Sequence, residues 1–120
     1  MKGMSSTSAA RPSPERLDRV FHALADRTRR ALLARLARGP APIGELARPF
    51  DMSFAAVSKH LRVLEDAKLV ERTIDGRVHR CALDAAPLRD ADGWLAHYRE
   101  YWDGTLESLE AHFRRGKPAR

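Results

Sequence analysis

The chain has a single cysteine, Cys81, and no apolar run that approaches the roughly 18 residues of a membrane span. One thiol excludes an internal disulfide and a Cys-x-x-Cys motif, and it suits a reducing interior. The N-terminal stretch MKGMSSTSAARPSP lacks the apolar segment of a secretory signal. We therefore expect a cytoplasmic protein in which residues 1–13 form a disordered N-terminal arm.

The sequence also lacks the motifs of common enzyme classes. It contains no glycine-rich phosphate loop, no Gly-x-Ser-x-Gly turn around a nucleophile and no His-Glu-x-x-His zinc pair. Its 5 histidines are scattered, and none is evidently paired with a nucleophile or an orienting carboxylate. We predict that the protein is not an enzyme and has no cofactor.

Positive charge is present in excess. The chain has 22 lysines and arginines against 16 acidic residues, a net charge of +6, and 43% of its 120 residues are hydrophobic, enough for one domain with one core. A basic surplus favours a polyanionic partner, either nucleic acid or an anionic membrane, although many small basic proteins bind neither. Arg27 and Arg29 lie where a helix is expected to begin, and a cation is unfavourable at that positive end of the helix dipole. Either a nearby phosphate or contact with solvent would make the two charges tolerable there.

Capping residues divide the first half of the chain into helices. Ser13 begins the first helix, Asp26 the second and Ser53 the fourth, and a short third helix fits residues 43–48. Only residues 49–52 join the third helix to the fourth. That spacing is typical of a helix-turn-helix.

A β-hairpin follows the fourth helix. Residues 69–74 and 77–83 alternate between apolar and polar side chains on either side of Asp75-Gly76, which predicts a two-residue turn of type I′. With a terminal helix, these elements predict a mainly α fold with a small β-hairpin (α+β). We expect a winged helix-turn-helix of five helices and a two-stranded wing over residues 14–113.

The last predicted element is one long amphipathic helix over residues 84–113, before a basic tail at 114–120. Its aromatic residues are too many for one thin domain to cover, and aromatic residues are enriched in subunit interfaces. We predict a C2 homodimer that reads an inverted repeat, unless the aromatic residues all fill the monomer core. The predicted dimer contacts are Leu17, Val20, Phe21, Trp94, Leu95, Tyr98, Tyr101, Trp102, Leu106, Leu109 and Phe113.

Three stretches of the chain resemble the ArsR/SmtB family of bacterial repressors. They are LADRTRRALLARLARGP, IGELARPFDMSFAAVSKHLRVLEDAKLV and IDGRVHRCAL, and the resemblance covers about residues 15–113. It implies a dimer that represses transcription by occupying a promoter. The family usually has glycine where Lys68 stands, so a left-handed cap there would cost the lysine about 1 kcal/mol.

The solvent side of the fourth helix is the predicted reader of the DNA major groove. Lys59 and Arg62 can reach guanine acceptors or phosphates, and Arg72 is expected with the wing arginines over the minor groove. The predicted DNA contacts are Ser53, Ala55, Ala56, Ser58, Lys59, His60 and Arg62 of the helix, and Arg77 and Arg80 of the wing. Two alternatives stay open: a solvated amphipathic helix, and a winged-helix module that binds a protein.

The metal-binding motifs of the family are missing. No cysteine lies in APIGELARPF, where the arsenic-type site needs a pair. His97 and His112 lack acidic partners at the expected spacing, although they could approach each other across an antiparallel dimer. We predict no metal site and a buried structural role for Cys81, with a metal- or thiol-sensing repressor as the alternative. The expected partners are double-stranded DNA and a second copy of the chain, with no membrane and an unknown inducer.

Overall fold

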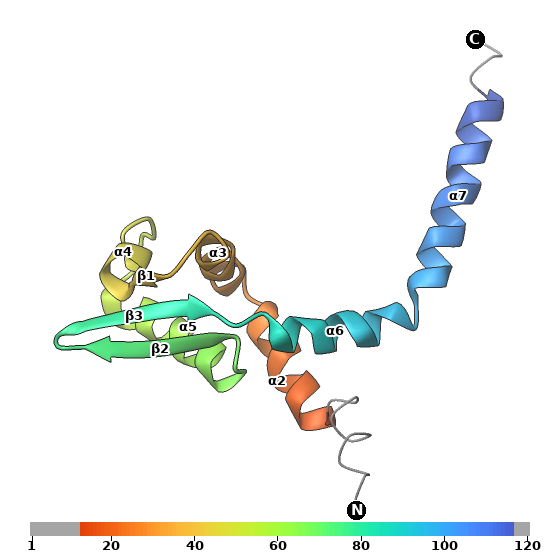
Figure 1. Ribbon diagram of the computed structural model, residues 1–120. Coiled ribbons are helices and arrows are strands. Elements are labelled where there is room, and N and C mark those ends of the chain that lie inside the picture. Colours follow the sequence, from red (N-terminus) through yellow and green to blue (C-terminus); the bar gives the residue numbers. More distant parts are fainter. Residues whose placement is uncertain (1–12, 117–120) are drawn as a thin grey trace, which may run out of the picture.

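The computed structural model describes residues 13–116, except for the side chains of residues 105–108 and 115–116. The predicted arm therefore lies outside the described residues up to residue 12, and the predicted tail does so from residue 117. The helices are α2 (Pro14–Leu24), α3 (Arg27–Leu36), α4 (Ile43–Ala47), α5 (Phe54–Asp66), α6 (Ala86–Ala96) and α7 (Arg99–Gly116), and the strands are β1 (Ala41–Pro42), β2 (Val70–Asp75) and β3 (Val78–Leu83) (Figure 1). The predicted mainly helical fold with a winged helix-turn-helix is confirmed.

Side-chain caps begin α2, α3 and α5 at the predicted residues. The Ser13 hydroxyl, the Asp26 carboxylate and the Ser53 hydroxyl each accept a hydrogen bond from the backbone N–H three residues further on, at 3.0 to 3.1 Å. Each cap satisfies a donor that has no partner within its helix. The predicted start of α5 is thus confirmed.

The core fixes which side of α5 faces outward. Val57, Leu61 and Leu64 of α5 are fully buried in one cluster with apolar residues of α3, α4 and the sheet. Residues three and four apart lie on one face of a helix, so the opposite side of α5 is left to solvent. That outward side carries Lys59 and Arg62, both exposed.

The wing belongs to a three-stranded antiparallel sheet. Its strand order is β1-β3-β2, and β1 joins through the pairs Ala41↔Cys81 and Pro42↔Arg80. A strand of two residues shows no alternation, so β1 could not be predicted from the sequence pattern. It ties the start of α4 to the base of the wing.

The turn of the hairpin differs from the prediction by one residue. Asp75 pairs with Val78, so the two turn residues are Gly76 and Arg77, not Asp75 and Gly76. Of these two turn residues, only Gly76 has a positive φ, 65°. A positive φ at the first turn residue alone fits a type II′ turn, so the predicted type I′ turn is wrong. Arg77 therefore stands at the tip of the wing.

The C-terminal segment forms two helices, so the predicted single helix is wrong and the described residues contain six helices, not five. The His97 N–H donates to the Trp94 carbonyl at 3.2 Å, and the Tyr98 N–H to the Leu95 carbonyl at 2.9 Å. Such three-residue bonds tighten the last turn of a helix and end it. The imidazole Nδ1 of His97 also lies 2.9 Å from the Trp94 carbonyl oxygen.

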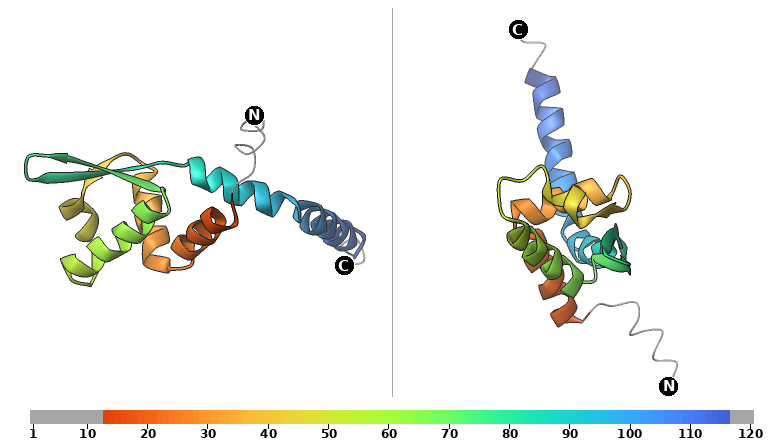
Figure 2. Two further views of the ribbon diagram at one scale, coloured as in Figure 1. Left: turned by 90° about the horizontal axis from the view of Figure 1, so that it is seen from below. Right: turned by 90° about the vertical axis from the view of Figure 1, so that its left-hand side faces the viewer.

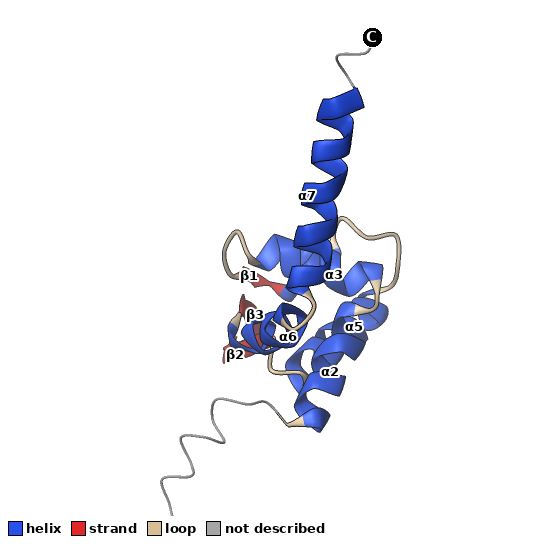
Figure 3. Cartoon of the chain, turned by 90° about the vertical axis from the view of Figure 1, so that its right-hand side faces the viewer, coloured by secondary structure: helices blue, strands red, loops and turns tan. Residues whose placement is uncertain are grey.

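The break lets α7 point away from the rest of the molecule. Figures 1 and 3 show α7 projecting from the body, and Figure 2 shows α2 beside α6, which is also a packed pair in the contact map. The radius of gyration is 19.6 Å, whereas a compact chain of this length has about 14 Å. The chain alone is therefore extended at its α6–α7 end.

Candidate nucleic-acid interface

Helix α5 and the β2–β3 wing carry the predicted DNA contacts. Of the predicted DNA contacts, Ala56, Ser58 and His60 are half-buried and the other six are exposed. Residues of both elements meet around a groove of about 390 Å³ between α5 and the wing, whose lining includes Ser58 and Arg77. Arg77 thus lies beside the α5 candidates, whereas Arg80 alternates with buried Cys81 and lies on the other face of the sheet.

Four of the predicted cations have no ion-pair partner among the described residues: Lys59, Arg62, Arg77 and Arg80. Five other arginines of the described chain are paired with carboxylates, at distances from 2.5 to 3.2 Å. A cation without a carboxylate partner keeps its full charge for an external anion. The surface can therefore bind a polyanion such as a phosphate backbone.

Arg72 does not join these cations. Its Nε and Nη2 atoms donate to the two carboxylate oxygens of Glu65, at 2.5 and 3.1 Å. The hydrogen bond to Glu65 raises the pKa of Arg72, against the opposing effect of burial. The expectation that Arg72 lies with Arg77 and Arg80 over DNA is corrected, because Glu65 at the end of α5 neutralises it.

His60 connects α5 to the junction of α2 and α3. Its Nδ1 lies 3.2 Å from Nη1 of Arg29 and 3.7 Å from a carboxylate oxygen of Asp26. Arg29 also donates to the carbonyls of His22 and Ala23, both at 2.9 Å, and so caps the end of α2. Neither a phosphate nor solvent is needed to explain Arg29. The contact between Arg29 and His60 could not be seen in the sequence, because the two residues are 31 positions apart in the chain.

The apolar candidates for dimerisation gather on α2, α6 and α7. Seven of them are between 37% and 73% exposed: Trp94, Leu95, Tyr98, Tyr101, Trp102, Leu109 and Phe113. Leu17 and Phe21 are half-buried, whereas Val20 is only 2% exposed and packs inside the chain. The side chain of Leu106 lies outside the described residues. The alternative that the aromatic residues all fill the monomer core is wrong.

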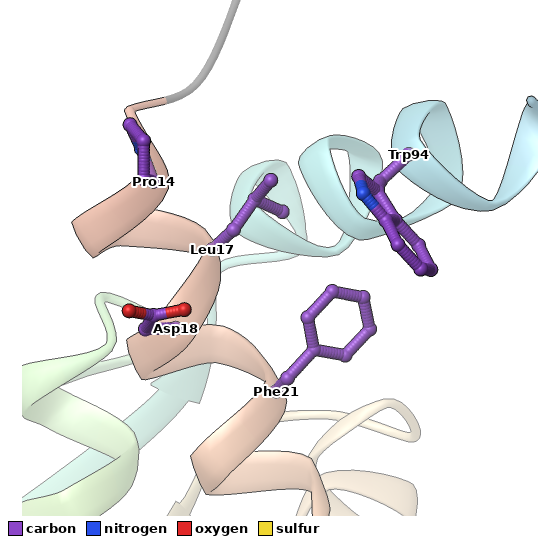
Figure 4. Close-up of a pocket in the computed structure, with 5 residues that line it drawn as sticks. All are labelled: Pro14, Leu17, Asp18, Phe21 and Trp94. Atoms are coloured by element: carbon purple, nitrogen blue, oxygen red, sulfur yellow. The ribbon is translucent and has the colours of Figure 1, made fainter.

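A groove of about 530 Å³ runs along this apolar face. It is lined by Pro14, Leu17, Asp18, Phe21 and Trp94. Figure 4 shows the rings of Phe21 and Trp94 facing each other across it, and their centroids are 5.6 Å apart in an edge-to-face arrangement. The groove is apolar except for Asp18, which suits apolar side chains of another polypeptide better than a charged ligand.

Comparisons with known proteins agree on one kind of protein. A family model described as a helix-turn-helix domain matches residues 24–73. The HTH-type transcriptional regulator Rv2034 of Mycobacterium tuberculosis is 58% identical over 53 residues, which is 44% of this chain and only 50% of that protein. The transcriptional repressor SdpR of Bacillus subtilis is 29% identical over 90 residues, 75% of this chain and 100% of that protein.

A solved structure decides the family. The crystal structure of an ArsR family transcriptional regulator matches with a TM-score of 0.72 and 45% sequence identity, over 78% of this chain and 96% of that chain. The chain belongs to the ArsR family. The resemblance carried by the helix-turn-helix and hairpin stretches is thereby confirmed.

The candidate sensor residues of this ArsR-family chain are separated in the structure. No three His, Cys, Asp or Glu side chains cluster as a metal site within the described residues. Cys81 is fully buried, and burial raises the pKa of its thiol, which confirms the predicted buried position. No described helix is long and apolar enough to cross a membrane.

Proposed function

We propose that this ArsR-family chain is a homodimeric transcriptional repressor that binds an inverted-repeat operator in double-stranded DNA. The observation that carries the proposal is the set of four exposed cations on α5 and the wing that have no carboxylate partner among the described residues. Repression is supported by the B. subtilis relative, whose name is that of a transcriptional repressor.

Helix α5 is the part proposed to enter the major groove. Lys59 and Arg62 point outward from its buried face, where they can donate to guanine acceptors or to phosphates. Ala55 is small and exposed, which permits close approach and contact with a thymine methyl group. The N-terminus of α5 at Ser53 has positive partial charge and suits a phosphate.

The wing is proposed to contact the adjacent minor groove. Arg77 stands in the turn at its tip and Arg80 on β3, both exposed. A narrow minor groove has an enhanced negative potential that attracts arginine. Helix and wing together would span two grooves on one side of the duplex.

Dimerisation is proposed through the exposed apolar face of α2, α6 and α7. An apolar surface of this extent is costly in water, and a C2 partner would cover it with the same face of its own chain. Two α5 helices related by a twofold axis read half-sites about one DNA turn apart, roughly 34–36 Å.

Fluorescence anisotropy with labelled duplex from the upstream region of the protein's own gene tests the proposal. We expect tight binding to this duplex, weak binding to a scrambled duplex, and a slope of log K against log salt near −5 to −7 if 6 to 8 phosphates are neutralised per dimer. Measurements at about 50 and 200 mM salt separate specific from purely electrostatic binding. Equal binding to both duplexes that salt abolishes would contradict the proposal and favour a protein-binding module.

A matched pair of variants locates the interface. Arg62→Ala is expected to weaken operator binding by about tenfold or more, the usual effect of losing one base-reading arginine. Arg89→Ala removes the same charge from an exposed position on α6, an element that has no part in the proposed DNA surface. If both variants lose the same affinity, the protein responds only to net charge and α5 has no special role.

A further inference from the structure

One half-buried ion pair joins α5 to the wing. Glu65 lies in the last turn of α5 and Arg72 lies on β2, and their side chains are only 23% and 21% exposed. The two parallel bonds, from Nε to Oε2 and from Nη2 to Oε1, form a bidentate arrangement. A planar guanidinium held at two points fixes orientation as well as distance.

The third nitrogen of the same guanidinium meets β3. Nη1 of Arg72 lies 3.3 Å from Nδ1 of His79. Arg72 pairs with Cys81 in the ladder, so His79 is its diagonal neighbour on the same face of the sheet. Because a guanidinium can only donate, Nδ1 must accept, and neutral His79 carries its proton on Nε2. Arg72 thus connects both strands of the wing to α5.

Arg72 is also the outermost ion-paired residue of the wing among the described residues, with only the β1 pair Pro42↔Arg80 one step further out. Beyond it, every residue from 73 to 78 is exposed, and the tip residue Arg77 is five residues further along the hairpin. Asp75, at the end of β2, is three strand residues beyond Arg72, or about 10 Å, so a tilt of about 10° at Arg72 displaces the tip by about 2 Å. A displacement of that size exceeds the tolerance of a hydrogen bond between arginine and DNA.

We propose that Glu65 and Arg72 are positioning residues whose ion pair sets the angle between α5 and the wing, so that α5 and Arg77 reach adjacent grooves of one operator together. Neither residue contacts DNA, and their effect passes through Arg77. The inference rests on the proposed DNA-binding function.

Glu65→Gln separates positioning from simple electrostatics. The substitution removes a negative charge beside a polyanion, so charge alone predicts tighter binding to operator. Loss of the Glu65–Arg72 ion pair predicts operator binding about tenfold weaker, an effect within the range of interaction energies of coupled residue pairs. Glu71→Gln is the matched control, since Glu71 is an exposed acid of β2 with no ion-pair partner among the described residues. Equal or tighter binding by Glu65→Gln than by Glu71→Gln overturns the inference.

A double-mutant cycle tests whether the pair acts through the tip. In the Arg77→Ala background, Glu65→Gln should cost less than about twofold in operator affinity, because the contact it positions is already absent. Additive losses would show that Glu65 acts independently of Arg77 and would overturn the inference. Arg72→Lys keeps the charge but loses the bidentate geometry, so it should also weaken binding severalfold while thermal unfolding shows a folded protein.

Measurements without DNA keep the two proposals distinguishable. Hydrogen exchange of the amides of residues 73–80 should be faster in Glu65→Gln than in the wild type and unchanged in Glu71→Gln. Long-range ¹H–¹⁵N spectra should show the Nε2–H tautomer of His79 in the wild type. The wild type could bind no operator while Glu65→Gln still shows faster exchange in the wing. That result would contradict the proposed DNA-binding function but would support the positioning of the wing by the Glu65–Arg72 ion pair. If exchange in the wing is the same in Glu65→Gln as in the wild type, the Glu65–Arg72 ion pair does not hold the wing and the inference is overturned.

Discussion

Lys68 holds a backbone conformation that favours glycine, with φ at 64°. The Lys68 N–H donates to the Glu65 carbonyl and the Leu69 N–H to the Leu64 carbonyl, both at 2.9 Å, which together make a Schellman cap at the end of α5. The left-handed cap that the sequence left open is therefore present, although lysine stands where the family usually has glycine. Lys68 lies between Glu65 of α5 and the start of β2, so a substitution at Lys68 changes the connection between α5 and the base of the wing.

Lys68→Gly is predicted to raise the free energy of unfolding by about 1 kcal/mol, because glycine adopts this conformation without the clash of a Cβ atom. Urea denaturation measures the change. Lys68→Ala is the control, since it removes the long side chain but keeps the Cβ atom. Equal stability of the two variants would show that the side chain, and not the backbone, sets the cost.

Cys81 is predicted to be unreactive in the folded protein. It is fully buried, and burial raises the pKa of its thiol, so little reactive thiolate is present. A disulfide reagent at pH about 8, near the ordinary thiol pKa, should modify the native protein only as fast as it unfolds. Rapid modification of the folded chain would revive the thiol-sensing alternative.

At the scale of elements, the Asp26 carboxylate that caps the start of α3 also lies near His60 of α5. The bond from the backbone N–H of Arg29 lowers the pKa of the Asp26 carboxyl, with a smaller contribution from nearby His60. A lowered folded pKa means that the stabilisation is complete above the unfolded pKa of about 4 and is lost as pH falls through the lower folded value.

The variant Asp26→Asn keeps a side-chain cap but cannot titrate. We predict that the wild type is the more stable at neutral pH and that the difference in Tm narrows between about pH 5 and about pH 2. Thermal unfolding followed by circular dichroism across this range measures it. A difference that stays constant over the range would mean that the charge of Asp26 contributes nothing.

Elements with local signals could be predicted from the sequence, and those set by distant contacts could not. Ser53 and the buried stripe Val57, Leu61 and Leu64 are local, and α5 begins where they predicted. The break between α6 and α7 at His97 was not predicted, because apolar residues continue at spacings of three and four across it. Among candidate site residues, the outward position of Lys59 and Arg62 followed from the helical period. The pairing of Arg72 with Glu65 depends on how the hairpin folds back, which no spacing shows.

At the scale of the whole molecule, α7 projects from the rest of the described chain and packs against little of it. Among the described elements its main contact is α6, and its apolar residues Trp102, Leu109 and Phe113 are between 41% and 62% exposed. A helix with one apolar stripe gains most of its stability from burying that stripe. The second chain proposed above would cover the exposed stripe and would account for the extended shape of the single chain.

Trp102→Arg is therefore predicted to weaken dimerisation by about thirtyfold or more, since a central interface tryptophan commonly contributes about 2 kcal/mol. Sedimentation equilibrium should show twice the 13.5 kDa chain mass for the wild type and a shift towards 13.5 kDa for the variant. Asp103→Arg places the same cation on the next residue of α7, off the apolar stripe, and should leave the dimer intact. Because one chain offers a single α5, the monomeric variant should also lose specific operator binding while keeping salt-sensitive binding to any duplex. A Trp102→Arg protein that stays dimeric would place the subunit interface elsewhere than on α7.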